Sequence, residues 1–170
     1  MKTKTTPFVL RKWENGDEHS LVKHANHKEV WQYMTDSFPH PYTIQKARRW
    51  IQLANDSQKE FHMAIEVRGE PVGCIGLVLK DDVYRRSAEL GYWLSPYYWN
   101  QGIMTNAIKQ MVIYAFETFN INRIYARVFE GNLASIRVLR KAGFQHEGTL
   151  RKAVYKNGKY LNEYIYGLLD

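Results

Sequence analysis

Cysteine is almost missing from this chain: Cys74 is the only one among 170 residues, so no disulfide can form within it. Its place in the apolar run 72–79 predicts a buried, unreactive thiol, and an oxidising compartment gains no support. Long apolar runs are missing too. After the basic start Met1-Lys2-Thr3-Lys4, only Phe8-Val9-Leu10 precede Arg11-Lys12, too few for a signal-peptide core or a membrane span. These absences predict a soluble, cytoplasmic protein with no membrane partner.

Runs of like charge are also lacking, although the chain is basic. Lys and Arg number 24 against 17 Asp and Glu, a formal net charge of +7. A basic surface attracts anions, whether nucleic acid, anionic lipid or a phosphate-bearing small molecule. Because the basic residues stay in small groups, direct binding of nucleic acid is not expected. The densest groups are Arg48-Arg49, Arg85-Arg86, and the trio Arg137, Arg140 and Lys141.

Apolar residues recur with strand-like and helix-like periods along the whole chain, which predicts a single domain over residues 1–170. Strands are expected at 8–13, 61–67, 72–79, 88–94, 121–129, 144–151 and 160–168. Helices are expected at 17–34, 43–54, 102–119 and 132–142, with a proline-bounded loop at 38–42. A helix pair, consecutive strands and a closing β-α-β-α-β order predict an α/β (α+β) fold around one mixed sheet.

The segment from Glu89 to Thr105 reads as a strand, a turn and the start of a long helix. The first N–H groups of a helix lack internal partners, and the helix dipole adds positive charge there, so such a start can bind phosphate. Gly102 permits close approach of an anion to the backbone, and Asn100 tolerates the left-handed conformation of a tight turn. On spacing alone, a plain strand–turn–helix connection remains the simpler interpretation.

The same segment resembles the cofactor-binding signature of the GNAT N-acetyltransferase superfamily, in the branch of the ribosomal-protein N-terminal acetyltransferases (RimJ/RimL type). The matching residues are Glu89-Leu90-Gly91-Tyr92-Trp93-Leu94, Pro96, Tyr98-Trp99, Gly102 and Thr105. A second block matches at Asn132, Ser135, Val138, Lys141, Gly143-Phe144 and Glu147-Gly148. With further likeness at Leu10-Arg11, 38–42, Arg151 and 157–160, the resemblance covers nearly the whole chain.

The resemblance implies a GNAT-like domain whose mixed, mostly antiparallel sheet is splayed in the middle and carries helices on both faces. It implies direct attack of an amine on the thioester of acetyl-coenzyme A, with coenzyme A as product and no metal. The backbone of Trp93 and Leu94 is then expected to pair with the pantetheine arm, and Asn132 and Ser135 to lie near the sulfur. The pyrophosphate is expected at Asn100, Gln101, Gly102, Ile103, Met104 and Thr105.

Three residues depart from the family pattern. Asn100 stands where glycine is usual, and Met104 where a small residue is usual, so its side chain must turn into the core. Leu139 stands where many relatives carry a tyrosine as general acid. The absence of this tyrosine is tolerable, because the conjugate acid of the leaving thiolate has a pKa of about 8.5 and the thiolate scarcely needs a proton to leave. Ser135 remains as the possible proton donor.

Glu89 is the candidate general base, acting directly or through water, because strand alternation places it opposite the core-facing Leu90 and Tyr92. An ion pair with Arg85 or Arg86 is an equal alternative.

His24 and His27, near Glu29, are expected on a solvated helix face rather than at a metal site. The acceptor pocket is expected among Trp31, Tyr33, Phe38, His40 and Tyr42.

The expected acceptor is a protein N-terminal α-amine, for example that of a ribosomal protein. An α-amine has a pKa of about 8 and a lysine side chain a pKa of about 10.4, so deprotonating lysine at neutral pH costs roughly 3 kcal/mol more. A small-molecule amine is the alternative acceptor. The alternative from another class is a non-catalytic basic module that binds nucleic acid or the ribosome.

Overall fold

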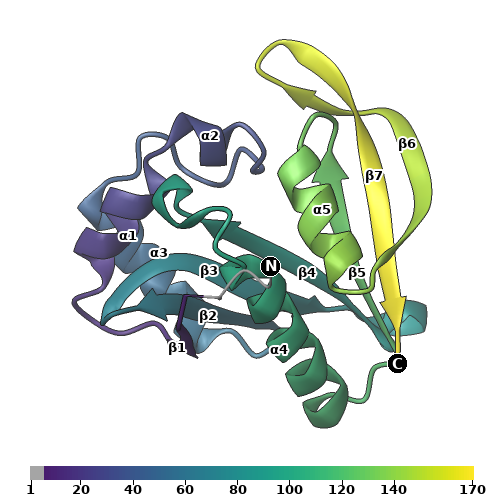
Figure 1. Cartoon of the computed structure of the whole chain (residues 1–170), viewed down its shortest axis with the longest axis horizontal. Helices are drawn as coiled ribbons and strands as arrows, with labels where there is room; N and C mark the ends of the chain where they lie inside the picture. Colours follow the sequence, from purple (N-terminus) through teal and green to yellow (C-terminus); the bar gives the residue numbers. More distant parts are fainter. Residues whose placement is uncertain (1–5) are drawn as a thin grey trace.

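The computed structural model describes residues 6–170, so the basic start Met1–Lys4 lies outside the described residues. One seven-stranded sheet crosses the molecule in the order β1-β2-β3-β4-β5-β7-β6 (Figure 1). The strands are β1 (Val9–Lys12), β2 (Glu60–Val67), β3 (Glu70–Leu79), β4 (Ser87–Leu94), β5 (Arg123–Phe129), β6 (Gln145–Lys156) and β7 (Lys159–Leu169). The helices are α1 (Glu18–Ala25), α2 (Lys28–Trp31), α3 (Ile44–Asp56), α4 (Ile103–Thr118) and α5 (Leu133–Lys141), with 3₁₀ turns η1 (Asp82–Tyr84) and η2 (Pro96–Tyr98).

The sheet is splayed between its two central strands. All neighbouring strands are antiparallel except β4 and β5, which run parallel. These two pair only at Ser87–Arg123, Ala88–Ile124 and Glu89–Tyr125, and then diverge (Figure 1). Beyond Glu89, β4 continues on β3 as far as Leu94, and β5 continues on β7 as far as Phe129. The expected mixed and splayed sheet is confirmed, and backbone groups along the gap lack a strand partner.

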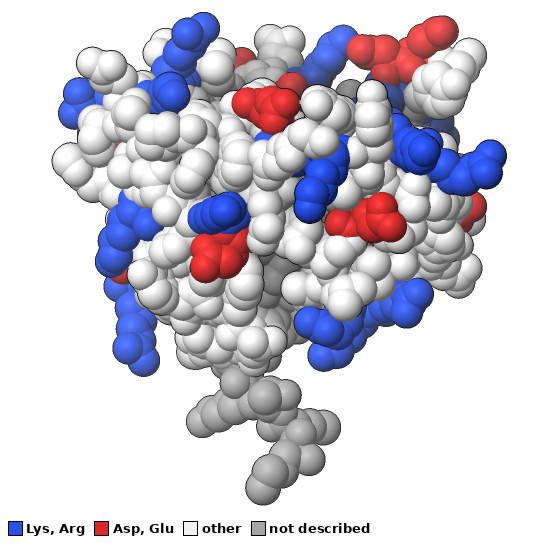
Figure 2. All heavy atoms as spheres, turned by 90° about the horizontal axis from the view of Figure 1, so that it is seen from above, with Lys and Arg blue, Asp and Glu red and all other residues white. Residues whose placement is uncertain are grey.

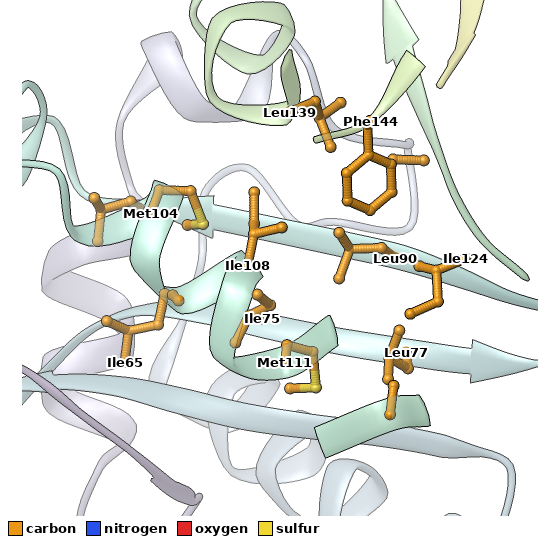
Figure 3. Packing of buried hydrophobic residues seen from close by; sticks show 14 of the residues in the cluster. Ile65, Ile75, Leu77, Leu90, Met104, Ile108, Met111, Ile124, Leu139 and Phe144 are labelled. Atoms are coloured by element: carbon orange, nitrogen blue, oxygen red, sulfur yellow. The ribbon is translucent and has the colours of Figure 1, made fainter. Parts of the chain in front are cut away.

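Helices cover both faces of the sheet, as expected. On one face, Met104, Ile108 and Met111 of α4 pack against Ile75 and Leu77 of β3 (Figure 3). These positions recur at helical spacing, which is why one face of α4 is apolar. The opposite face holds a second core around α1 and α3, built from Trp13, Leu21, Ala47, Ile51 and Trp93.

The single helix expected at 17–34 is wrong, since α1 and α2 are separate short helices. Asn26, between them, binds the backbone of Tyr42: its Nδ2 donates to the carbonyl at 2.8 Å, and its Oδ1 accepts from the N–H at 2.6 Å. The residue after Asn26 is extended, with φ −115° and ψ 127°. A contact with the following loop thus interrupts a continuous apolar pattern. The other expected helices and strands are present, and β6 runs on to Lys156.

Basic side chains lie interspersed with acidic ones on the face shown in Figure 2, without gathering into one patch. The surplus of Lys and Arg is therefore spread out there, as the absence of basic runs predicts. Among residues 6–170, no helix is long and apolar enough to cross a membrane.

The core between α4 and the sheet can be tested with two isoleucines of the same helix. Ile108 is 0% exposed and Ile113 is 58% exposed. We expect Ile108→Ala to lower the free energy of unfolding by about 2–5 kcal/mol, because it removes buried contacts and leaves a cavity. Ile113→Ala should change it by less than about 0.5 kcal/mol. Urea denaturation measures both, and equal losses would contradict this packing.

Candidate functional site

The turn before α4 has the left-handed backbone that its sequence predicts. Gly102, the N-cap of α4, has φ +75°, and Asn100 has φ +60°. Trp99 Nε1 donates to the carbonyl of Leu94 at 2.7 Å, which ties the turn to the end of β4. Asparagine adopts this conformation more readily than most residues, so the missing glycine at position 100 does not change the path of the chain.

The backbone N–H groups from Gln101 to Thr105 make no hydrogen bond to any residue that the structure describes. They lie at the start of a 16-residue helix, where the dipole adds positive charge. The side chains of Ile103 and Met104 are buried in the core, as expected for Met104. A phosphate group can therefore approach this backbone closely, which fits the predicted pyrophosphate site.

The inner edge of β4 is set by its pairing with β3. Because Ser95 N–H donates to Val72 O at 2.9 Å, alternation turns the backbone of Trp93 toward β3 and that of Tyr92 and Leu94 toward the gap. For pairing with a pantetheine arm, the register favours Leu94 over Trp93. The carbonyl of Leu94 already accepts from Trp99, so its N–H is the group that remains for a ligand.

The start of α5 borders the gap on the side opposite β4. Asn132 caps this helix, since its side chain accepts from Ser135 N–H at 3.2 Å. Ser135 Oγ lies 2.7 Å from the hydroxyl of Tyr92, which reaches across from β4. Burial raises the pKa of Tyr92 well above its usual value, and the hydrogen bond to Ser135 offsets only part of this rise. Leu139, one turn further along α5, is buried in the core (Figure 3).

Glu89 lies in a cluster of opposite charges at the point where β4 and β5 part. Its carboxylate accepts from Lys80 Nζ at 2.6 Å and from the Tyr125 hydroxyl at 3.1 Å, and lies 3.5 Å from Arg127 Nε. Arg85 and Arg86, the alternative ion-pair partners expected for Glu89, donate instead to backbone carbonyls. The ion-pair alternative is therefore present with other partners, and it does not remove Glu89 from the edge of the gap.

Arg127 extends this cluster to a third strand, because its Nη1 lies 3.2 Å from Glu163 Oε2 on β7. Burial opposes the charge of Arg127, but Glu89 and Glu163 outweigh it and raise the pKa of the guanidinium. Burial likewise opposes the charge of Lys80, and Glu89 outweighs it, so the pKa of Lys80 is also raised. Each carboxylate in the cluster has a cationic neighbour.

The segment after α1 meets the β6–β7 hairpin across the mouth of the gap, where α2 faces the hairpin in Figure 1. Trp31 stacks on His40 with ring centroids 5.0 Å apart. Lys156 Nζ lies 4.2 Å from the centroid of the Trp31 ring and pairs with Asp36 at 2.7 Å. Trp31 and His40 thus lie beside the β6–β7 hairpin, and their role as an acceptor wall stays a prediction.

The other predicted wall residues divide into two groups. The Tyr33 hydroxyl donates to Gly131 O at 3.2 Å, so Tyr33 joins the mouth of the gap to the turn before α5. Phe38 packs edge-on against Tyr42 and Trp93, with ring centroids 5.4 and 6.0 Å away. Phe38 and Tyr42 therefore belong to the second core beneath the mouth.

The solvated position expected for His24 is wrong, since its side chain is buried. Its Nδ1 lies 3.0 Å from Ser95 Oγ, and burial lowers the pKa of the imidazole although Glu70 partly offsets this. His24 thus joins α1 to the start of the loop that enters α4, a contact that sequence spacing does not indicate. No three metal-ligating side chains come together in residues 6–170. Cys74 is buried, as predicted, and burial raises the pKa of its thiol to about 12.

A helix start whose amides have no partner among residues 6–170 lies beside the splayed sheet and faces a row of titratable groups, an arrangement that suits an acyl-coenzyme A-dependent transferase. The sequence profile of the acetyltransferase (GNAT) domain matches residues 8–145, and the chain belongs to this family. The class of enzyme predicted from the sequence, an acetyl-coenzyme A-dependent N-acetyltransferase, is confirmed.

The names of the similar proteins include two different acceptors, spermidine and a ribosomal protein. The chain is 33% identical over 171 residues to the uncharacterized N-acetyltransferase p20 of Bacillus licheniformis, covering 97% of this chain and 94% of the relative. It is 31% identical over 159 residues to spermidine N(1)-acetyltransferase of Escherichia coli K12, covering 90% and 81%. Its fold matches that of RimL, a ribosomal L7/L12 alpha-N-protein acetyltransferase solved with coenzyme A, with TM-score 0.84, 24% identity, and 97% and 95% coverage.

The anion site at the start of α4 can be tested with two glycines of similar backbone conformation. Gly102 has φ +75° and Gly69, in the β2–β3 turn, has φ +82°. We expect Gly102→Asp to abolish binding of acetyl-coenzyme A, because it adds bulk and negative charge beside the unpartnered amides. Gly69→Asp bears a similar backbone cost outside the amides from Gln101 to Thr105 and should bind as the wild type does. Isothermal titration calorimetry measures both, and tight binding by Gly102→Asp would place the site elsewhere.

Proposed function

We propose that this enzyme transfers the acetyl group of acetyl-coenzyme A to a protein N-terminal α-amine, by direct attack of the amine on the thioester. When bound, the coenzyme supplies the acetyl group in this activated form. The backbone N–H groups from Gln101 to Thr105 would hold its pyrophosphate, and Leu94 N–H its pantetheine arm. Asn132 and Ser135 would lie near the sulfur end. These amides, which make no hydrogen bond to residues 6–170, and the left-handed backbone at Asn100 and Gly102 support this assignment.

We base the choice of acceptor on how the charges around the gap are paired. A polyamine presents several cations, and binding them needs carboxylates without cations of their own. Glu89, Glu163 and Asp36 each already pair with a lysine or an arginine. An acceptor with one amine on a chain of neutral amides, such as a peptide N-terminus, suits these three paired carboxylates better. The aromatic pair Trp31 and His40 offers such a chain an apolar contact.

The reaction needs a group to accept the proton that the amine loses, and we assign this role to Glu89, directly or through a water molecule. Its carboxylate lies 2.6 Å from Lys80 Nζ and 3.5 Å from Arg127 Nε, at the edge of the gap where the amine would approach. An α-amine, with a pKa near about 8, demands less of such a base than a lysine does. Backbone N–H groups along the gap would stabilise the developing oxyanion.

The role of Glu89 can be separated from a purely structural one by the pH profile of turnover. We expect Glu89→Gln to lower kcat at pH 7 by roughly 10²-fold, and by less at pH 9, where more of the amine is already deprotonated. Affinity for the coenzyme should change little. Glu117→Gln, an exposed carboxylate on α4, is the matched control. A fall in kcat that is equal at all pH values would leave Glu89 as a structural ion pair.

The acceptor class can be determined by following release of free coenzyme A thiol with three kinds of amine. We expect the highest kcat/KM with peptides that carry a free N-terminus, and low values with spermidine and with Nα-acetylated peptides whose only amine is lysine. Preference for spermidine would replace the protein acceptor by a small-molecule amine. Coenzyme binding without turnover on any amine would indicate a non-catalytic member of the family.

A further inference from the structure

The hydrogen bond between Tyr92 and Ser135 joins residues that lie 43 positions apart in the chain, one on each lip of the gap. Neither hydroxyl has another described hydrogen-bond partner. A phenol is the stronger acid of the two, so the Tyr92 O–H is the natural donor and Ser135 Oγ the acceptor. In that arrangement the single proton of Ser135 remains available for a different acceptor.

Ser135 also lies where negative charge is favoured. It is the third residue of the nine-residue helix α5, and the Asn132 cap holds its backbone N–H. The first turn of a helix stabilises an anion nearby. Leu139, four residues on and therefore on the same side of α5, carries no polar group that could assist. The Tyr92 hydroxyl thus brings a phenol from β4 to the side of α5 where the helix itself has none.

Resting on the proposed function, we propose that Tyr92 is a positioning residue for the leaving group. Its hydroxyl donates to Ser135 Oγ and so directs the Ser135 proton toward the sulfur of the bound coenzyme. Tyr92 acts only through Ser135, which makes the contact with sulfur.

The proton and electron balance requires no other reactant. The amine nitrogen bonds to the carbonyl carbon, the carbon–sulfur bond breaks, and its electron pair stays on sulfur. Glu89 or water takes the proton from nitrogen. Ser135 keeps its proton and stabilises the thiolate by a hydrogen bond, and Tyr92 keeps its proton in the hydrogen bond to Ser135. This is enough for a leaving thiolate whose conjugate acid has a pKa of about 8.5.

The pH dependence of product binding tests this without any turnover. Calorimetry would measure the affinities for coenzyme A and for desulfo-coenzyme A, which lacks the thiol. Every other titrating group is common to both compounds, so the ratio of the two affinities reports the thiol alone. A hydrogen bond to the thiolate lowers the thiol pKa in the complex below its free value, so relative affinity for coenzyme A must rise with pH. For the wild type we expect a rise of about five- to tenfold from pH 7 to pH 9, equivalent to a thiol pKa lowered by roughly one unit.

Three variants complete the experiment. Tyr92→Phe keeps the ring but loses the hydroxyl, and should reduce the rise to less than about twofold. Ser135→Ala should do the same, and the double variant should show no further loss, because both act on one hydrogen-bond chain. Tyr84→Phe is the control, since it removes a hydroxyl from a side chain that is 69% exposed on η1. It should behave as the wild type does.

The possible outcomes separate this inference from the proposed function. A wild-type rise that persists in Tyr92→Phe, or no rise in the wild type, overturns the role of Tyr92 and leaves the coenzyme site intact. Failure of the wild type to bind either compound overturns the coenzyme site itself. Circular dichroism checks folding. If Tyr92→Phe does not fold, a rise that persists in Ser135→Ala overturns the role of Tyr92, because Tyr92 acts only through Ser135, and alanine is well suited to a helix.

Discussion

The short parallel pairing of β4 with β5 is the constraint on which the rest of the structure depends. Three residue pairs hold the strands together, and β3 and β7 then carry them apart. Leu90 and Ile124 fill the closed end with side chains of the first core. At the open end, both α4 and α5 begin, so two helix starts and a row of unpaired strand backbone face the same space. A sheet paired along its full length would leave no such groups for a ligand.

The charges at this junction combine support with chemistry. Glu89, Arg127 and Glu163 come from three strands and tie the two halves of the sheet together where the strand pairing stops. Together with Lys80, they bring two positive and two negative charges to this junction, whereas the whole chain carries +7. The surplus positive charge lies elsewhere on the surface, and the chemistry of the gap is set by local pairs rather than by the total charge.

Much of the fold was accessible from the sequence, because strand and helix periods are local properties. The stripe of α4 and the helix starts expected at Thr43 and Asn132 are confirmed. The break between α1 and α2 was not accessible, since Asn26 is held by a backbone 16 residues away. The burial of His24 escaped prediction for the same reason, because Ser95 lies 71 residues further on.

By itself, the sequence determined the family, the order of elements and the turn that starts α4, since Asn100 and Gly102 lie in one contiguous segment and act through their own backbone. Only the tertiary structure decided which groups share the gap. It paired Glu89 with Lys80 and Arg127 instead of Arg85 or Arg86, and it brought the Tyr92 hydroxyl to Ser135. The physical reason is that these contacts join residues far apart in the chain, so they form only once the order and register of the whole sheet are set.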